Sequence, residues 1–291
     1  MRARTRRSLI ALPVIFAIGG AIAWSGSQNG LSAFGWPLFA LCGAIAFGVN
    51  GLVFLHANAA KTERFYDLTG SLTYLTVIAV AFAFGNADAR SALLAGMVTI
   101  WAARLGSFLF VRITKDGSDG RFDEIKINFA NFLMTWMLQG LWVFLTASCA
   151  LAAMTSANSR PVGWMAYLGA VIWAIGFGIE VAADSQKKGF RADPSNADRF
   201  ITTGLWSWSR HPNYFGEIVL WVGVAIVALP ALSGWQFVTL ISPIFVFVLL
   251  TRISGVPMLE ARAKKKWGED PSFQEYTRRT SVLVPRPPTA S

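Results

Sequence analysis

Long apolar segments separated by short polar connections dominate the chain. Most of these segments have about the 20 residues that an α-helix needs to cross a bilayer. Eight segments are predicted to span a membrane, at residues 9–24, 36–56, 69–85, 91–111, 129–154, 161–183, 213–231 and 235–251. We therefore expect an all-α fold, a polytopic integral membrane bundle of about seven or eight transmembrane helices.

The composition agrees with this pattern. Hydrophobic residues make up 54% of the 291 positions and charged residues only 14%, which is too apolar for an ordinary soluble domain. Cys42 and Cys149 both lie within predicted spans, so we expect two buried thiols and no disulfide. Because the whole chain has two Cys and two His, we also expect no metal site.

The basic residues indicate how the spans are oriented. Of the 26 Lys and Arg, 23 lie in segments on one side of the predicted membrane, at residues 1–8, 57–67, 112–128, 184–212 and 252–291. Basic residues collect on the cytoplasmic side, so we expect both termini to be cytoplasmic and these segments to contact anionic membrane lipid. A nucleic-acid partner is not expected, because the charge is divided among five segments and forms no single face.

Two interpretations of the amino terminus remain open. Arg2 to Arg7, the apolar run that follows and the sequence Ala21-Ile-Ala23 resemble a signal peptide with its cleavage site. We favour an uncleaved first helix, and cleavage would leave the topology of the other spans unchanged.

No repeat or flexible linker divides the chain, so we expect one membrane domain over residues 1–291. Within it we expect a substrate-side half at 57–128 and a cofactor-binding half at 180–285 that includes cytoplasmic loops. In the carboxy-terminal segment, residues 257–267 are predicted to form a short interfacial helix with Pro257 in its first turn.

Polar residues cluster around the sixth and seventh spans. Glu180 and Asp184 are one helical turn apart, and a basic stripe continues the same side of the helix as Lys187, Lys188 and Arg191. An acid inside an apolar span needs a partner or a cavity. Pro212 is expected to begin the seventh span, and a helix amino terminus beside Arg and His suits an anion such as a phosphate.

The order and spacing of these residues resemble the carboxy-terminal half of the steroid 5-alpha-reductase family, most closely its bacterial branch. The resemblance covers about residues 100–285. The residues that carry it are Glu180, Asp184, Gln186, Lys187, Arg191, Asn196, Arg199, Gly204-Leu-Trp206 and Ser209-Arg-His-Pro-Asn-Tyr-Phe-Gly-Glu217. Membrane sterol reductases and isoprenylcysteine methyltransferases carry a similar Arg-His-Pro-x-Tyr segment.

The resemblance implies NADPH-dependent reduction of an activated carbon–carbon double bond, in an enone of a steroid-like, isoprenoid or other lipid substrate. It also implies location in a bacterial inner membrane. The chain has no Gly-x-Gly-x-x-Gly turn after a strand, so helices and loops would hold the dinucleotide. The cofactor-binding residues expected are Arg104, Glu180, Asp184, Lys188, Arg191, Asn196, Arg199, Arg210, His211, Asn213, Tyr214 and Glu217.

The catalytic acid is expected in the first half. Reduction of an enone needs a donor that polarises the carbonyl, and a Tyr or a carboxylic acid of raised pKa can supply it. Glu63, Asp67 and Tyr74 are predicted to share one helix face, with Asp67 the first candidate and Tyr66 an alternative. A solvated loop and helix cap is the competing interpretation for the residues around Glu63.

Two other functions fit parts of the same pattern. A methyltransferase using S-adenosylmethionine would explain Arg210-His-Pro-x-Tyr214, although that cofactor has no phosphate to occupy Arg191 and Arg199. A transporter or lipid-binding protein would use the intramembrane polar groups as a substrate path, and the lack of an inverted repeat disfavours it. The sequence leaves the oligomeric state open.

Overall fold

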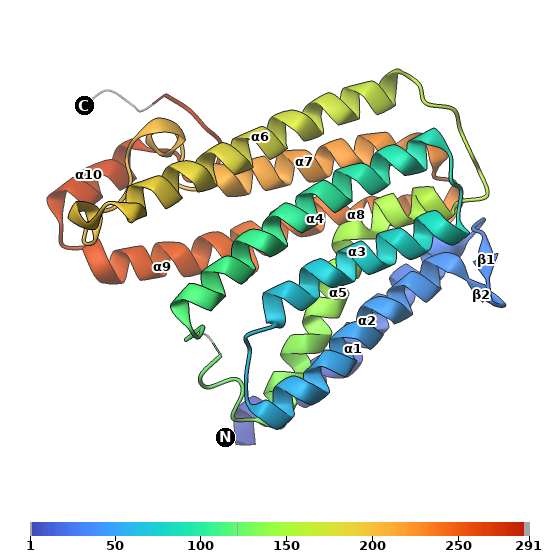
Figure 1. Ribbon diagram of the computed structural model, residues 1–291, viewed down its shortest axis with the longest axis horizontal. Helices are drawn as coiled ribbons and strands as arrows, with labels where there is room; N and C mark the ends of the chain where they lie inside the picture. Colours follow the sequence, from blue (N-terminus) through green and yellow to red (C-terminus); the bar gives the residue numbers. More distant parts are fainter. Residues whose placement is uncertain (1, 121, 288–291) are drawn as a thin grey trace. The chain divides into compact units, whose positions relative to one another are not determined.

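The computed structural model describes residues 2–120 and 122–287, and most of them are helical (Figure 1). Eight helical segments of the described chain are long and apolar enough to cross a membrane. The predicted polytopic all-α fold is therefore confirmed, and the chain is an integral membrane protein. The α-helices are α1 (Arg2–Ser27), α2 (Leu38–Ala60), α3 (Tyr66–Phe84), α4 (Ala89–Asp116), α5 (Phe129–Thr155), α6 (Trp164–Ala192), α7 (Pro212–Ala228), α8 (Ile241–Val248), α9 (Gly255–Trp267) and α10 (Pro271–Arg279).

Short elements join these helices. An antiparallel hairpin of β1 (Ser32–Ala33) and β2 (Trp36–Pro37) precedes α2, with Ser32 opposite Pro37 and Ala33 opposite Trp36. The second predicted span therefore began two residues too early. The remaining short elements are a π-helical turn at Leu249–Ile253 and 3-10 turns at Pro194–Asn196, Gly204–Ser207, Leu229–Ala231 and Gly234–Leu240.

The eighth apolar segment is not one regular α-helix, in contrast to the prediction. It begins as the 3-10 segment Gly234–Leu240, where Ser233 and Gln236 form a capping box. Pro243 has no N–H and fits best in the first turn of an α-helix, which agrees with the start of α8 just before it, at Ile241. The π-helical turn then leads to α9, which confirms the short helix predicted at 257–267.

The chain forms two compact units. The first runs from the amino terminus to Ala166 and includes Val224–Ser242; the second contains Tyr167–Gly223 and the chain from Pro243 onward. The expected substrate-side half lies in the first unit. The expected cofactor-binding half lies in the second unit, except for residues 224–242.

The first unit is built around α5, most of whose side chains are buried. Helices α1, α2 and α3 pack against it, and the rings of Phe39 and Phe144 meet at 5.0 Å between α2 and α5. Cys42 and Cys149 are both buried free thiols, as predicted.

The second unit depends on close packing of α6 and α7, which run side by side in Figure 1. A Cβ atom added at Gly216 would lie 2.6 Å from the Gly176 carbonyl oxygen, and one at Gly223 would lie 2.6 Å from the Gly169 carbonyl oxygen. The two backbones approach this closely because small residues face each other, as in many membrane helix pairs. This contact fixes how the polar ends of α6 and α7 are placed.

Candidate functional site

The second unit contains a cavity of about 290 Å³ next to the start of α7. Six basic residues and one acid line it: Lys187, Arg191, Arg199, Arg210, Arg262, Lys266 and Glu260. Aromatic side chains complete the wall: Phe190, Phe200, Trp206, Trp267, Phe273 and Tyr276. A cavity with this lining is suited to a ligand that combines anionic groups with a flat ring.

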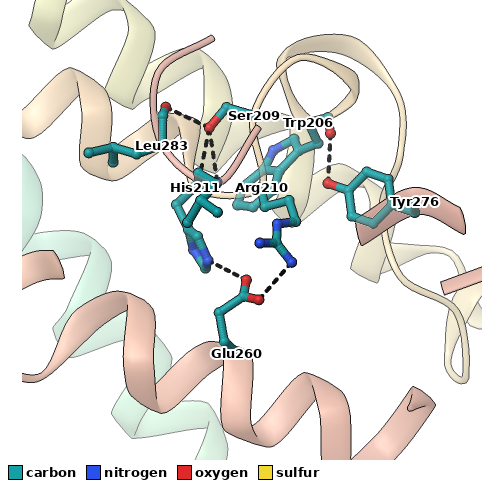
Figure 2. Close-up of polar contacts among 8 residues, drawn as sticks. Trp206, Ser209, Arg210, His211, Glu260, Tyr276 and Leu283 are labelled. Atoms are coloured by element: carbon teal, nitrogen blue, oxygen red, sulfur yellow. Dashed lines mark hydrogen bonds and ion pairs between the residues drawn. The ribbon is translucent and has the colours of Figure 1, made fainter. Parts of the chain in front are cut away.

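Glu260 holds two residues of the motif that precedes α7. Its carboxylate accepts a hydrogen bond of 2.7 Å from Arg210 Nη1 and lies 2.8 Å from His211 Nε2 (Figure 2). Since a carboxylate accepts, Nε2 carries the hydrogen and Nδ1 of a neutral ring is left as an acceptor. The His211 side chain is buried and its ring stacks on Tyr214 at 5.7 Å. Glu260 thus fixes the direction of both side chains at the cavity wall.

The segment before α7 is held in place by hydrogen bonds to its neighbours. Trp206 Nε1 donates to the Ala183 carbonyl at 3.0 Å, and Tyr276 donates its hydroxyl hydrogen to the Trp206 carbonyl at 2.7 Å (Figure 2). Burial raises the pKa of Tyr276, which keeps the hydroxyl protonated as this bond requires. Ser209 Oγ donates to the Leu283 carbonyl and accepts from the His211 amide.

A second set of contacts joins helices α9 and α10 to the loop that follows α6. Trp267 Nε1 donates to the Asp198 carbonyl at 2.8 Å, and the Phe200 ring lies 5.1 Å from Phe273 and 5.6 Å from Tyr276. Lys187 Nζ lies 4.4 Å above the Trp206 ring, a cation–π contact. Residues distant in the sequence therefore build one wall of the cavity.

The structure brings four of the predicted cofactor residues to this cavity: Arg191, Arg199, Arg210 and His211. Lys188 is exposed and is not among its lining residues. Asn196 donates to the Phe190 carbonyl at 3.1 Å and so covers the end of α6. The structure places both of these predicted residues outside the cavity.

Other predicted cofactor residues lie along the contact between α6 and α7. Asn213 Nδ2 donates to Asp184 Oδ1 at 3.2 Å, which joins the two helices. Glu180 is buried on α6, where its backbone lies against Gly216, and Glu217 is half-buried in the first turns of α7. The polar ends of α6 and α7 are therefore joined by this hydrogen bond.

Three buried polar atoms near the start of α7 have no hydrogen-bond partner within the described part of the chain. They are Arg210 Nε, His211 Nδ1 and Asn213 Oδ1. A buried polar atom without a partner is costly, so such atoms often mark the place of a missing ligand or water.

In the first unit, Glu63 does not share a helix with Asp67, and that prediction was wrong. Helix α2 ends at Ala60, the following residue Lys61 caps it in the left-handed conformation with φ 51°, and α3 begins only at Tyr66. Glu63 lies in the turn between them. Its backbone carbonyl accepts a hydrogen bond from the Tyr66 amide at 2.8 Å.

Both carboxylate oxygens of Glu63 are occupied by the loop that joins α4 to α5. Oε1 accepts from the Asp119 amide at 3.0 Å, and Oε2 accepts from Lys126 Nζ at 2.9 Å. Burial alone would raise the pKa of Glu63, but these hydrogen bonds and the Lys126 charge together lower it below its usual range. The Glu63 side chain therefore stays ionised, and its hydrogen bonds anchor this loop.

The other candidate acids lie on α3. Asp67 is half-buried in the first turn, and Tyr66 donates its hydroxyl hydrogen to the Thr135 carbonyl at 3.1 Å. Tyr74 packs edge-on against Trp101 at 5.2 Å. Arg104 lies on α4 in this same unit, 5.7 Å from the centre of the Phe108 ring.

The Glu63 contacts predict a pH dependence for the loop. A carboxyl group whose pKa is lower in the folded than in the unfolded protein stabilises the fold at pH values above its unfolded-state pKa. This stabilisation is lost as the pH falls through the folded-state pKa. We expect the protection factor of the Asp119 amide, which is the intrinsic exchange rate divided by the observed rate at the same pH, to fall as the solution is acidified below the ordinary range of a Glu pKa. In a Glu63→Gln variant, the protection factor should already be reduced at neutral pH and should change little on acidification, because the residue no longer titrates. A wild-type amide whose protection does not change over this range would contradict the assignment.

Several residues of the cavity were not predicted from the sequence, above all Glu260, Arg262 and Trp267. They lie on α9, which the sequence indicated only as an interfacial helix. A signal was present: Glu260 is the one acid in a helix that carries four basic residues. No cluster of His, Cys, Asp or Glu that could hold a metal ion occurs among the residues that the structure describes.

Comparison with known proteins identifies the family. A family model described as "Protein of unknown function (DUF1295)" matches residues 53–280. The chain belongs to the DUF1295 family. It also resembles the steroid 5-alpha-reductases, which confirms the resemblance seen in the motifs. No solved structure matches it significantly.

Relatives of this DUF1295 protein include enzymes with named activities. An uncharacterized protein of Schizosaccharomyces pombe is 22% identical over 79% of this chain and 73% of its own length. The 3-oxo-5-alpha-steroid 4-dehydrogenase 1 of Bos taurus is 28% identical over 40% of each chain. The steroid 5-alpha-reductase DET2 of Gossypium hirsutum is 27% identical over 44% of this chain and 45% of its own length. The chain thus matches less than half the length of the two named steroid enzymes.

Proposed function

We propose that the chain is a membrane reductase that uses NADPH to reduce an activated carbon–carbon double bond in a hydrophobic substrate. The observation that carries this proposal is the cavity of the second unit, where six basic residues and several aromatic rings surround one space. The activities after which the two steroid enzymes are named support the reaction class. We further propose a bacterial inner membrane as its location.

The residues of the cavity fit the adenosine and phosphate part of NADPH. Arginine side chains make strong paired hydrogen bonds to phosphate, and aromatic or Arg faces can stack on adenine. A volume of about 290 Å³ is at the lower end of ligand pockets, so the cavity suits one part of a dinucleotide. In this proposal Arg191 and Arg199 hold phosphate groups, with Lys187 and Lys266 adding positive charge.

The unpartnered atoms at the start of α7 fit a further part of the same ligand. Asn213 already donates to Asp184, and its buried Oδ1 can accept from an amide such as the nicotinamide carboxamide. Arg210 and His211 are directed by Glu260, so their remaining polar atoms have fixed positions. Bound NADPH would supply a hydride. The residues of this chain bind and orient it.

The same charge distribution disfavours S-adenosylmethionine. That cofactor has a positively charged sulfonium and no phosphate, so a cavity with six cations and one acid would repel it. The methyltransferase alternative therefore lacks support from this site.

The proton donor remains a prediction, with Asp67 as the first candidate. Glu63 is less suited, because its lowered pKa and its contacts to the 119–126 loop keep it ionised. We expect Asp67→Asn to lower turnover of an enone by about 100-fold or more while NADPH affinity is unchanged, since a general acid contributes roughly that much. The measurement is NADPH oxidation by the protein in liposomes containing the enone.

Tyr74→Phe and Glu63→Gln serve as parallel variants in that assay. If Asp67→Asn retains full turnover and one of the parallel variants loses it, the donor is reassigned. If the wild-type protein oxidises no NADPH with any of a series of hydrophobic enones, the proposed reaction is refuted.

A further inference from the structure

An apolar groove lies on the first unit between α1 and α5. Its volume is about 410 Å³. Side chains of Ala11, Val14 and Ile18 line it from α1, and Met134, Leu138 and Leu141 line it from α5. Of the described residues that line the groove, Arg7 alone is charged.

The groove runs along both helices and begins near the amino-terminal end of each. Asn128 Nδ2 donates to Thr5 Oγ1 at 2.8 Å where α5 begins, and Gly19 lies near Leu141 further along, so α1 and α5 run in the same direction. From Arg7 to Ile18 a helix rises by about 16 Å. This length is about half of the roughly 30 Å hydrocarbon layer, the depth of one leaflet.

Arg7 lies at the end of this stripe where α1 leaves the apolar region. Residues 7, 11, 14 and 18 recur at three- and four-residue spacing and so face one side of α1. The Arg7 side chain is exposed. Its charge therefore lies at the amino-terminal end of an otherwise apolar groove.

We propose that this groove is a binding site for an anionic phospholipid, with one acyl chain in the slot and the phosphate at Arg7. The apolar wall would accept an acyl chain of any phospholipid. The single positive charge at its mouth selects a headgroup with net negative charge over a zwitterionic one. The site belongs to the first unit and is independent of the proposed reductase activity.

Native mass spectrometry of the intact chain in mild detergent tests this site, with phosphatidylglycerol and phosphatidylcholine of equal acyl chains as probes. Phosphatidylglycerol should bind more tightly to the wild type. Arg7→Gln should lower its affinity about fivefold, the effect of one basic residue at a membrane surface. Ala11→Trp should fill the slot and reduce binding of both lipids.

Two neighbouring substitutions serve as matched controls. Arg6→Gln removes an adjacent charge outside the groove, and Ala17→Trp adds the same ring to an exposed position of α1 that does not line it. Both variants should bind phosphatidylglycerol as the wild type does. Equal affinity of the wild type for the two lipids, or the same loss in Arg6→Gln as in Arg7→Gln, would overturn the proposal.

Discussion

Arg191→Ala is expected to weaken NADPH binding by about 10- to 100-fold, because one charge-assisted contact to phosphate contributes roughly 1.5–3 kcal/mol. Arg191 lies in the last turn of α6 and lines the basic cavity, so its removal takes one cation from the proposed phosphate site. The effect on NADH should be smaller if Arg191 contacts the additional phosphate of NADPH. Fluorescence titration of the purified protein with each dinucleotide measures both affinities.

Arg278→Ala is the matched control for this experiment. Arg278 is a basic residue of the same unit, but it pairs with Glu275 at 2.7 Å and is not among the residues that line the cavity. Its replacement should leave NADPH affinity unchanged. Normal NADPH binding by Arg191→Ala, or equal losses in the two variants, would remove Arg191 from the cofactor site.

Gly216→Ala is expected to destabilise the second unit by about 1–3 kcal/mol, the usual cost of excess volume in a packed interior. The new methyl group would lie 2.6 Å from the Gly176 carbonyl oxygen and 2.7 Å from the Glu180 amide nitrogen. Both are backbone atoms, so α6 and α7 must separate. The thermal unfolding midpoint in detergent should fall. Because Asp184 and Asn213 are joined across the same two helices, NADPH affinity should fall with it.

Gly178→Ala provides the comparison on the same pair of helices. Gly178 lies on α6, and a Cβ atom there would meet no atom within 4 Å among the described residues. Alanine favours a helix over glycine by about 1 kcal/mol, so this variant should be as stable as the wild type or more so. Equal destabilisation by the two substitutions would mean that helix contact is not the cause.

The sequence predicted the helices well, because the length and hydropathy of a membrane span are local properties. Pro212 marked the start of α7, and residues 257–267 were recognised as a separate helix. Local patterns did not indicate where a span becomes irregular. The 3-10 start of the eighth segment depends on Ser233, Gln236 and Pro243, whose effect on the backbone is not visible in the average hydropathy.

The candidate site was predicted only in part for a related reason. Arg191, Arg199, Arg210 and His211 are concentrated in a short stretch around α6 and α7, so one motif contains them. Glu260 is about fifty residues further along, and its role depends on α9 packing against that motif. The error at Glu63 also has a local cause, since Lys61 adopts a left-handed conformation that helical spacing alone does not indicate.

The central claim is that the second unit binds NADPH, and a competition titration of the purified, intact chain tests it most directly. NADPH, NADH and S-adenosylmethionine are titrated separately and then in competition. The basic cavity predicts NADPH binding about tenfold or more tighter than NADH, from at least one additional phosphate contact, and no displacement of NADPH by S-adenosylmethionine. Equal affinity for the two dinucleotides, or displacement of NADPH by S-adenosylmethionine, would contradict the account.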